Sequence, residues 1–309
     1  MSDMNQQAEN ATDLLKGAID LHHHGYPEIA LDIKTWHDDV DELNCAAAAG
    51  MSAILFKSHM WPTMGRVYHL TKAVPNIAAL SSITLNPIAG GFSPLAVEAA
   101  GRLGASAVFM PTWGAAHDIN RKSFSNHLAH VLKSTVNPHG GLDALDERGK
   151  VKTEVRECLA VAAQFGMMIG TGHISPRESI ALAGAAKDYG INSIFFQHPD
   201  SNSTAATREE ILEMAALDAM IEVCALGMLP PYQRISPKTY IEIISQITAQ
   251  KAVLSTDYFF EWAPPSPDTL RMIIGIFLSL GLPAADLKLM VQTNPRKLLA
   301  GTWPKKTEA

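Results

Sequence analysis

The sequence predicts an α/β fold: a closed (β/α)8 TIM barrel with one insertion after the fourth strand. Two patterns carry this prediction. Short apolar runs that end in a polar residue alternate with stretches of helical spacing along the 309 residues, which is typical of parallel strands covered by helices. The ends of eight such runs lie 25 to 35 residues apart, except for a single step of 61 residues. Each ordinary step has room for one helix and one return strand.

The eight expected strands begin just after residue 17 and continue through most of the chain. They are Ala18–His24, Ala53–His59, Ile77–Asn86, Ala105–Thr112, Met167–His173, Asn192–His198, Ala219–Ala225 and Ala252–Asp257. The long step contains polar sequence rich in glycine, asparagine and histidine, which predicts an insertion at about 114–150. An open doubly wound sheet is the alternative. That fold would place a glycine-rich phosphate turn after the first strand, where this chain has Asp20–Gly25.

Stretches of helical spacing separate the expected strands, and two of them carry capping signals. The clearest stretches are Ser93–Leu103, Thr153–Gln164, Ser175–Tyr189, Thr207–Leu217 and Pro237–Gln250. Ser175 and Thr207 each precede a glutamate by three residues, which is the pattern of a capping box. We therefore expect one barrel domain over 17–301, preceded by a polar arm or helix at 1–16 and followed by a tail at 302–309.

The insertion at 114–150 follows a strand, so we expect it on the catalytic face of the barrel, as a lid or as a contact between subunits. Leu128, Val131 and Leu132 form an apolar stripe at helical spacing. Because such a stripe must be buried against something, it favours the subunit contact and hence a homo-oligomer.

The composition excludes several classes of protein. With 47% hydrophobic and 18% charged residues, the chain is not intrinsically disordered. A net charge of −6, without a run of three basic residues, argues against a nucleic-acid partner. The longest apolar stretch, Met272–Leu282, is far shorter than the roughly 20 residues that span a bilayer, so we expect no membrane partner. The N-terminus is polar and the three cysteines lie in helix-like or apolar segments, so we expect a cytoplasmic protein.

Side chains that can bind a metal gather at the ends of the expected strands. They are His22, His24, His59, His173, His198 and Asp257. His22 and His24 are two residues apart on one strand, so both should point into the barrel. In a barrel of this kind the active site lies at the carboxyl ends of the strands. Three imidazoles and one carboxylate would leave an open position on a catalytic divalent ion, for which Zn²⁺ is the first expectation and Mn²⁺ and Fe²⁺ are alternatives.

Five short motifs occur in an order and spacing that resemble the amidohydrolase superfamily. They are Asp20–His24, Gly172–His173, His198–Pro199, Ser255–Asp257 and Thr293–Leu299, and the resemblance covers about 17–301. It implies that His22, His24, His173 and Asp257 are metal ligands. It also implies that His198 binds a second metal or a substrate oxygen, and that Asp257 is the general base.

The chain departs from the superfamily on the fourth strand, where a lysine or glutamate often bridges two metals. Here strand two instead carries Lys57 and His59 on one face. Lys57 could form a carbamate that bridges two metals, or stay cationic and be held by Glu222 or a substrate carboxylate. The sequence favours one metal and a cationic Lys57 that faces the substrate. His59 is a candidate ligand, proton shuttle or buried hydrogen-bonded residue.

Further polar and aromatic residues near the strand ends are candidate substrate contacts. They are Asn86, Glu222, Trp61, Trp113 and Tyr258. The rings favour a small, ring-bearing substrate. The predicted reaction is hydrolysis of an amide, lactam or lactone by water that the metal activates. The alternatives are a metal-dependent decarboxylase of a small aromatic or heterocyclic acid, a phosphoester hydrolase, which would favour a histidine two residues after Asp257, and a metal-storing barrel without activity.

Overall fold

The computed structural model describes residues 10–132, 140–230 and 232–304. Its strands are all parallel and form two sheets, one of three strands and one of six, and within each sheet the strands follow the order of the chain. They are β1 (Ile19–His24), β2 (Ala53–Lys57), β3 (Ala78–Leu80), β4 (Ser82–Thr84), β5 (Ala107–Phe109), β6 (Met168–Gly170), β7 (Ile194–Phe196), β8 (Met220–Cys224) and β9 (Ala252–Ser255). Only Ser81 separates β3 from β4, so these two strands together are the expected third strand.

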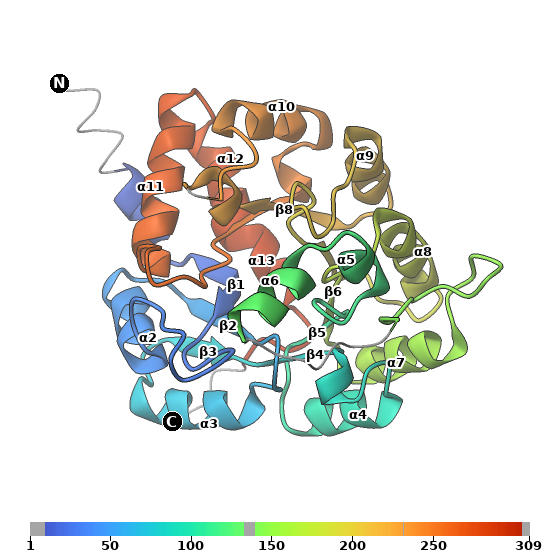
Figure 1. Ribbon diagram of the computed structural model, residues 1–309. Coiled ribbons are helices and arrows are strands. Elements are labelled where there is room, and N and C mark those ends of the chain that lie inside the picture. The colour runs from blue at the N-terminus through green and yellow to red at the C-terminus, as the bar shows by residue number, and fades with distance from the viewer. Residues whose placement is uncertain (1–9, 133–139, 231, 305–309) are drawn as a thin grey trace.

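The first and last strands lie side by side. Asp257 N donates to His22 O at 2.8 Å, and His24 N donates to Tyr258 O at 2.9 Å. These bonds connect the chain just after β9 to β1 and bring the two ends of the strand order together. Figure 1 shows the strands in the middle of the molecule with helices around them. The predicted (β/α)8 architecture is confirmed.

The helices follow the strands in alternation. They are α2 (Asp39–Ala48), α3 (Met64–Ala73), η1 (Pro87–Ala89), α4 (Pro94–Arg102), α5 (Ala116–Asn120), α6 (Phe124–Val131), α7 (Thr153–Gln164), α8 (Pro176–Lys187), α9 (Arg208–Ala216), η2 (Leu226–Met228), α10 (Pro237–Ile247), η3 (Ala249–Lys251), α11 (Ser266–Ser279), α12 (Ala284–Lys288), η4 (Leu289–Thr293) and α13 (Asn294–Leu298). Both expected capping boxes are present, at the starts of α8 and α9. Within the residues that the structure describes, no helix has the length and apolar character needed to cross a bilayer.

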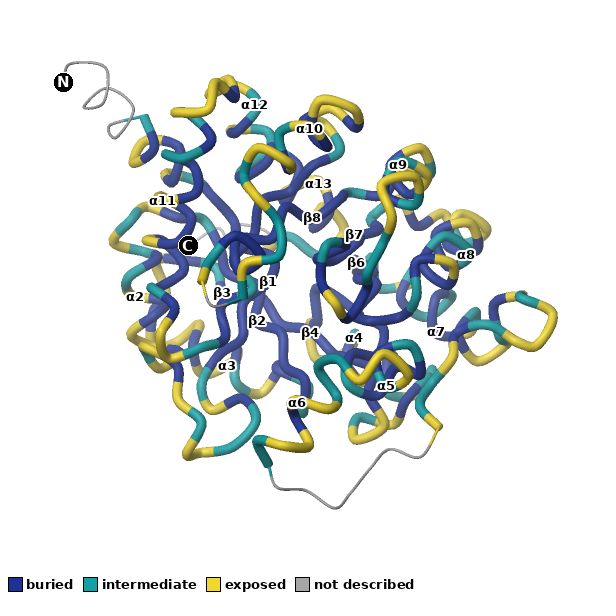
Figure 2. Tube along the Cα trace, turned by 45° about the horizontal axis from the view of Figure 1, so that its top comes forward, coloured by how far each residue is buried: buried dark blue, intermediate teal, exposed yellow. Residues whose placement is uncertain are grey.

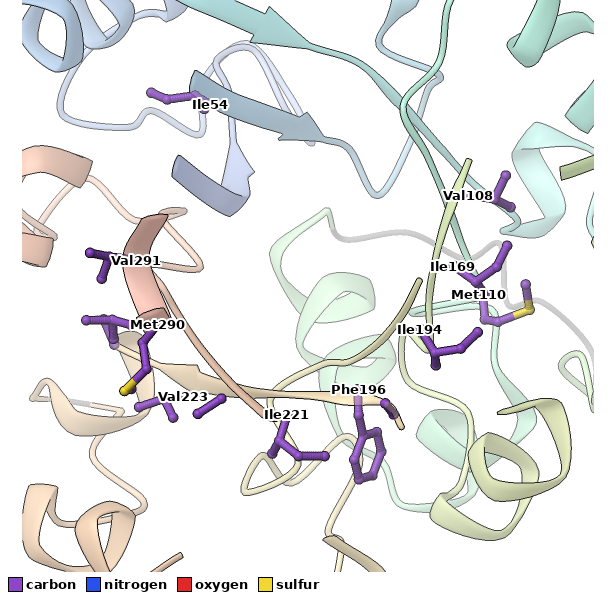
Figure 3. Close-up of a cluster of buried hydrophobic side chains, with 14 of the residues drawn as sticks. Ile54, Val108, Met110, Ile169, Ile194, Phe196, Ile221, Val223, Met290 and Val291 are labelled. Carbon is purple, nitrogen blue, oxygen red and sulfur yellow. The ribbon is translucent and has the colours of Figure 1, made fainter. Parts of the chain in front are cut away.

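The strands bury apolar side chains on both faces. One cluster lies between strands and helices and includes Ile54 of β2 (Figure 3). Phe56 of the same strand belongs to it as well. A second cluster includes Leu55 of β2 and Phe109 of β5. Because side chains alternate along a strand, Lys57 lies on the face of Leu55, inside the barrel. Figure 2 shows the strands buried and the exposed residues on the outer helices and loops.

A register shift in β1 determines which of its histidines point inward. Asp20 pairs with Ile54 and His23 pairs with Phe56, so two residues of β1, Leu21 and His22, lie opposite Leu55 alone. Such a bulge reverses the alternation of faces after it. Leu21 therefore packs with the inner cluster, while His22 and His24 also point inward and His23 points outward.

Gly172, directly before His173, cannot carry a side chain without strain. Its φ is +58°, and an added Cβ would lie 2.3 Å from Met110 O. We expect Gly172→Ala to destabilise the protein by about 3 kcal/mol through left-handed backbone strain and overpacking. The matched control is Gly184→Ala in α8, where a Cβ meets no atom within 4 Å and should stabilise by about 0.5–1 kcal/mol. Urea unfolding of both variants measures the difference, and equal midpoints would contradict the prediction.

Candidate metal centre and active site

Five buried imidazoles form a closed circuit at the carboxyl ends of the strands. The ring centroids are 5.3 Å apart for His22 and His24, and 4.3 Å apart for His24 and His59. The circuit continues over 6.0 Å from His59 to His173 and over 4.9 Å from His173 to His198. It closes over 5.4 Å from His198 to His22. The structure therefore brings together all five of the histidines that the sequence predicted for this site.

Each of these rings has a hydrogen-bonding partner at Nδ1. The partners are Glu222 for His22 at 2.8 Å, Glu28 for His24 at 3.3 Å, Thr112 for His59 at 2.9 Å, Asp118 for His173 at 2.8 Å, and Ser201 and Thr204 for His198 at 3.2 and 3.3 Å. Histidines that bind a metal commonly use their second ring nitrogen in this way, which fixes the tautomer and the ring orientation. These partners all bind at Nδ1 and so do not occupy the Nε2 atoms, although Nε2 of His22 also lies 2.9 Å from Lys57 Nζ.

Asp257 completes a set of metal donors with His22 and His24. Its Oδ1 lies 3.0 Å from His22 Nε2 and 3.4 Å from His24 Nε2. His24 Nε2 is buried and makes no hydrogen bond within the described part of the chain. Donor atoms of these three residues all lie within 4.8 Å of one another, and a second such group contains His24, Glu28 and His59. Imidazole nitrogens and a carboxylate oxygen suit Zn²⁺ and related divalent ions, so the residues present fit the expected metal.

Burial keeps most of these rings in the form that binds a metal. It lowers the pKa of His22, His59, His173 and His198, so these imidazoles are neutral near pH 7. Burial also opposes charge on His24, but the neighbouring carboxylates of Asp257 and Glu28 raise its pKa above the usual value. Asp257 is ionised: although burial disfavours its charge, the facing imidazoles hold its pKa well below the usual range.

The backbone is strained at two of the site residues. His198 has a φ of 23° and Asp257 has a φ of 53°, both in the left-handed region that residues with a Cβ rarely adopt. His198 N donates to a carboxylate oxygen of Glu222, and Asp257 N donates to His22 O, so hydrogen bonds hold both positions. Non-glycine residues in this region cluster at functional sites, because the surrounding structure must stabilise them.

Lys57 lies beside His22 rather than in the cavity. Its Nζ is 2.9 Å from His22 Nε2, and the residue is 0% exposed. The substrate-facing position expected from the sequence is therefore not what the structure shows. Nor does Glu222 hold Lys57: its carboxylate contacts His22, the backbone of His198 and the hydroxyl of Ser255.

A cavity of about 440 Å³ opens above the imidazoles. His59, His173, His198 and Asp257 line it, together with aromatic side chains of the surrounding loops. Those rings are Phe124, Tyr232, Phe259 and Phe260. The lining is aromatic, as the sequence led us to expect, but Trp61, Trp113 and Tyr258 are not part of it.

The other candidate substrate contacts lie outside the cavity lining. Tyr258 stacks on the outward-facing His23, with ring centroids 4.8 Å apart, and its hydroxyl accepts from His37 N. Trp113 and Asn86 each donate a hydrogen bond of 2.9 Å to His59 O. Trp61 is 62% exposed. Trp113 and Asn86 therefore support the His59 loop, and Tyr258 packs against His23 and the backbone at His37.

The described part of the insertion covers the site. Phe124, at the start of α6, has its ring centroid 4.4 Å from that of His59 and 5.8 Å from that of His173. Asp118 of α5 bonds to His173 Nδ1. Leu128 is buried within this chain, while Val131 is half-buried. Over these helices the insertion contacts the site itself, and the subunit contact favoured by the sequence stays a prediction.

We expect Asp118→Asn to lower metal affinity by roughly 10- to 100-fold, the usual cost of losing a partner behind a histidine ligand. The carboxylate holds the His173 ring by its Nδ1 and favours a donor at that atom, and an amide does so less strongly. Competition against a chelating dye measures the effect. Asp143→Asn, an exposed carboxylate of the same insertion, is the matched control. Equal affinities in the two variants would show that Asp118 only shapes the insertion.

Comparison with known proteins agrees with this description. The family described as DUF6282, a family of unknown function, matches residues 17–222. No curated protein matches the chain. Among solved structures, an amidohydrolase from Pseudomonas aeruginosa is 13% identical with a TM-score of 0.63, covering 96% of this chain and 99% of that one. An organophosphorus hydrolase from Deinococcus radiodurans is 14% identical with a TM-score of 0.55, covering 92% of each chain.

A third similar structure is a 2,6-dihydroxybenzoate decarboxylase from Rhizobium. It is 13% identical with a TM-score of 0.52, covering 92% of this chain and 99% of that one. Identities at this level establish a shared fold, and that fold is the one that the resemblance in the sequence implied. This chain has the TIM-barrel fold of the amidohydrolase superfamily, and it belongs to the family of unknown function DUF6282.

Proposed function

We propose that the protein is a metal-dependent hydrolase that cleaves a C–N or C–O bond of a small, ring-bearing amide, lactam or lactone. One observation carries the proposal: five buried imidazoles, each bonded at Nδ1 to a partner behind it, lie together with the ionised Asp257, and three of them line one cavity with that carboxylate. Such a set of preoriented nitrogen donors next to a carboxylate supports metal catalysis more than a structural role.

His22, His24 and Asp257 would hold the ion, with Zn²⁺ as the first candidate and Mn²⁺ and Fe²⁺ as alternatives. When bound, a divalent ion lowers the pKa of water and polarises a carbonyl group. Asp257 is the proposed general base: it would take a proton from water at one carboxylate oxygen and later return it to the leaving group. His173 and His198 would bind a second ion or orient the substrate oxygen, since both rings line the cavity.

A metal-dependent decarboxylase is the second candidate. The protein from Rhizobium that shares this fold is described as a decarboxylase of an aromatic acid. A carboxylate near a buried metal centre serves either reaction, so the donor set alone does not separate them. The aromatic lining of the cavity accommodates a ring in both cases.

A panel of lactones, cyclic amides and hydroxybenzoates, assayed with the purified protein, tests the proposal. We expect hydrolysis of at least one lactone or cyclic amide, loss of turnover after treatment with a chelator, and recovery on addition of Zn²⁺, Mn²⁺ or Fe²⁺. Release of CO₂ from the hydroxybenzoates without any hydrolysis would favour the decarboxylase. Turnover that survives complete metal removal would contradict both.

A further inference from the structure

Arg234 is a half-buried cation beside the candidate metal centre. It lies between η2 and α10 and lines the same cavity as His173, His198 and Asp257. Its Nε donates to Asp200 Oδ2 at 3.1 Å, and its side chain is 19% exposed. Its Nη2 is buried and has no hydrogen-bond partner among the residues that the structure describes.

The contacts of Arg234 hold the guanidinium in place through Nε and leave Nη2 without a hydrogen bond among the described residues. Asp200 is itself held by the hydroxyl of Tyr240, which donates to Oδ1 at 2.7 Å. The pair packs directly on the backbone at Gly227, where an added Cβ would lie 2.5 Å from Asp200 Oδ2 and 3.0 Å from Arg234 Nη2. A guanidinium held through Nε keeps its terminal nitrogens for a second anion, in the planar fork that matches a carboxylate.

The charges around the cavity favour an anionic ligand. Of the described residues that line it, Asp257 is the single carboxylate, and that group belongs to the candidate metal centre. Lys122 and Arg234 are the cationic side chains of the lining, Arg234 as one half of its ion pair with Asp200. A bound divalent ion would add more. The lining thus offers cationic partners to a substrate and no free acid that would repel an anion.

Stacked aromatic side chains line the cavity together with Arg234. Tyr232 and Phe260 have ring centroids 4.5 Å apart with planes 15° apart, and Phe260 and Trp262 are 5.4 Å apart with planes 14° apart. Tyr232 and Phe260 line the cavity with Arg234. A flat, apolar surface next to a fixed guanidinium suits a ring that carries an acidic group.

We infer that the substrate carries a carboxylate, and that Arg234 binds it while the bond to be cleaved lies at the metal centre. The substrate class is therefore a carboxylated lactone, cyclic amide or N-acyl amino acid rather than a neutral ester or amide. This inference rests on the proposed function for the reaction, but the anion site rests on Arg234 and its surroundings alone.

The test uses two pairs of probes, titrated calorimetrically into the purified protein. In the first pair, glutaric acid monohydroxamate and its neutral carboxamide analogue share a metal-binding hydroxamate and differ in the terminal carboxylate. We expect the acid to bind the wild type about 10-fold or more tightly than the amide, as for a charge-assisted hydrogen bond. Arg234→Met should remove this preference and leave the affinity of the amide unchanged. The matched control, Arg271→Met on the exposed side of α11, should keep the preference.

A double variant guards against misfolding. Arg234→Met leaves Asp200 without its cation, so Asp200→Asn combined with Arg234→Met removes both charges, and it should also lose the preference. The second pair of probes, 3-phenylpropionate and its amide, has no hydroxamate. If the neutral hydroxamate does not bind, but 3-phenylpropionate binds in a manner that depends on Arg234, the metal proposal fails and this inference stands. An unchanged preference in Arg234→Met, or none in the wild type, overturns the inference.

Discussion

His22→Ala and Asp257→Ala are expected to lose their bound metal, with affinity reduced by at least roughly 100-fold, because each removes a direct ligand rather than a partner behind one. The two side chains meet at 3.0 Å between His22 Nε2 and Asp257 Oδ1, where an ion would sit with His24. Metal content after gel filtration, measured by mass spectrometry, checks this result. If one of the lactones, cyclic amides or hydroxybenzoates proves to be a substrate, its turnover should fall together with the metal content.

Two exposed histidines provide the controls. His69 on α3 and His130 on α6 lie at the surface, so His69→Ala and His130→Ala should keep both metal and activity. The ligand variants should stay folded, because aliphatic side chains fill the interior of the barrel independently of the histidines. Circular dichroism would show this. Equal metal content in all four variants would overturn the assignment of the centre.

The architecture and the five histidines could be predicted because both follow from periodic signals. Parallel strands buried on both faces give apolar runs, and a barrel places the residue after each run at one rim. His173, His198 and Asp257 could be located from that rule alone. In β1 the rule of alternating faces needs a correction, because the bulge before His23 lets Leu21 and His22 both point inward.

The groups behind the histidines could not be predicted in the same way. Asp118 reaches His173 from an insertion with no periodic signal, and Arg234 meets Asp200 across 34 positions of sequence. Such contacts depend on how loops fold over the rim. Glu28 is nearer to a sequence signal, since it follows His24 by four residues and bonds to its ring. The prediction that Tyr258 contacts the substrate was wrong. Its neighbour Asp257 lines the cavity, but Tyr258 stacks on His23.

Lys57 is expected to lose its charge when the metal binds, because it lies beside a ligand of the ion. Its Nζ lies 2.9 Å from His22 Nε2, the atom that would bind the ion. Two like unit charges 4 Å apart repel by about 4 kcal/mol at an effective dielectric of about 20, and a divalent ion doubles that figure. Burial also lowers the pKa of Lys57, although Asp257 and Glu222 act in the opposite direction. Lys57 should therefore be uncharged whenever the metal is bound.

The metal affinity of Lys57→Met distinguishes a neutral Lys57 from a cationic one, because the two predict changes in opposite directions. If the amine is neutral, or has combined with CO₂ to give a carbamate and a proton, it contributes a donor, and Lys57→Met should bind metal at least about 10-fold more weakly. If the lysine is an ammonium ion, the same variant removes repulsion and should bind metal more tightly. Lys251→Met, on an exposed ion pair with Asp218, is the control. Recovery of binding by short carboxylic acids would identify the carbamate, because a free carboxylate can occupy the position that it leaves.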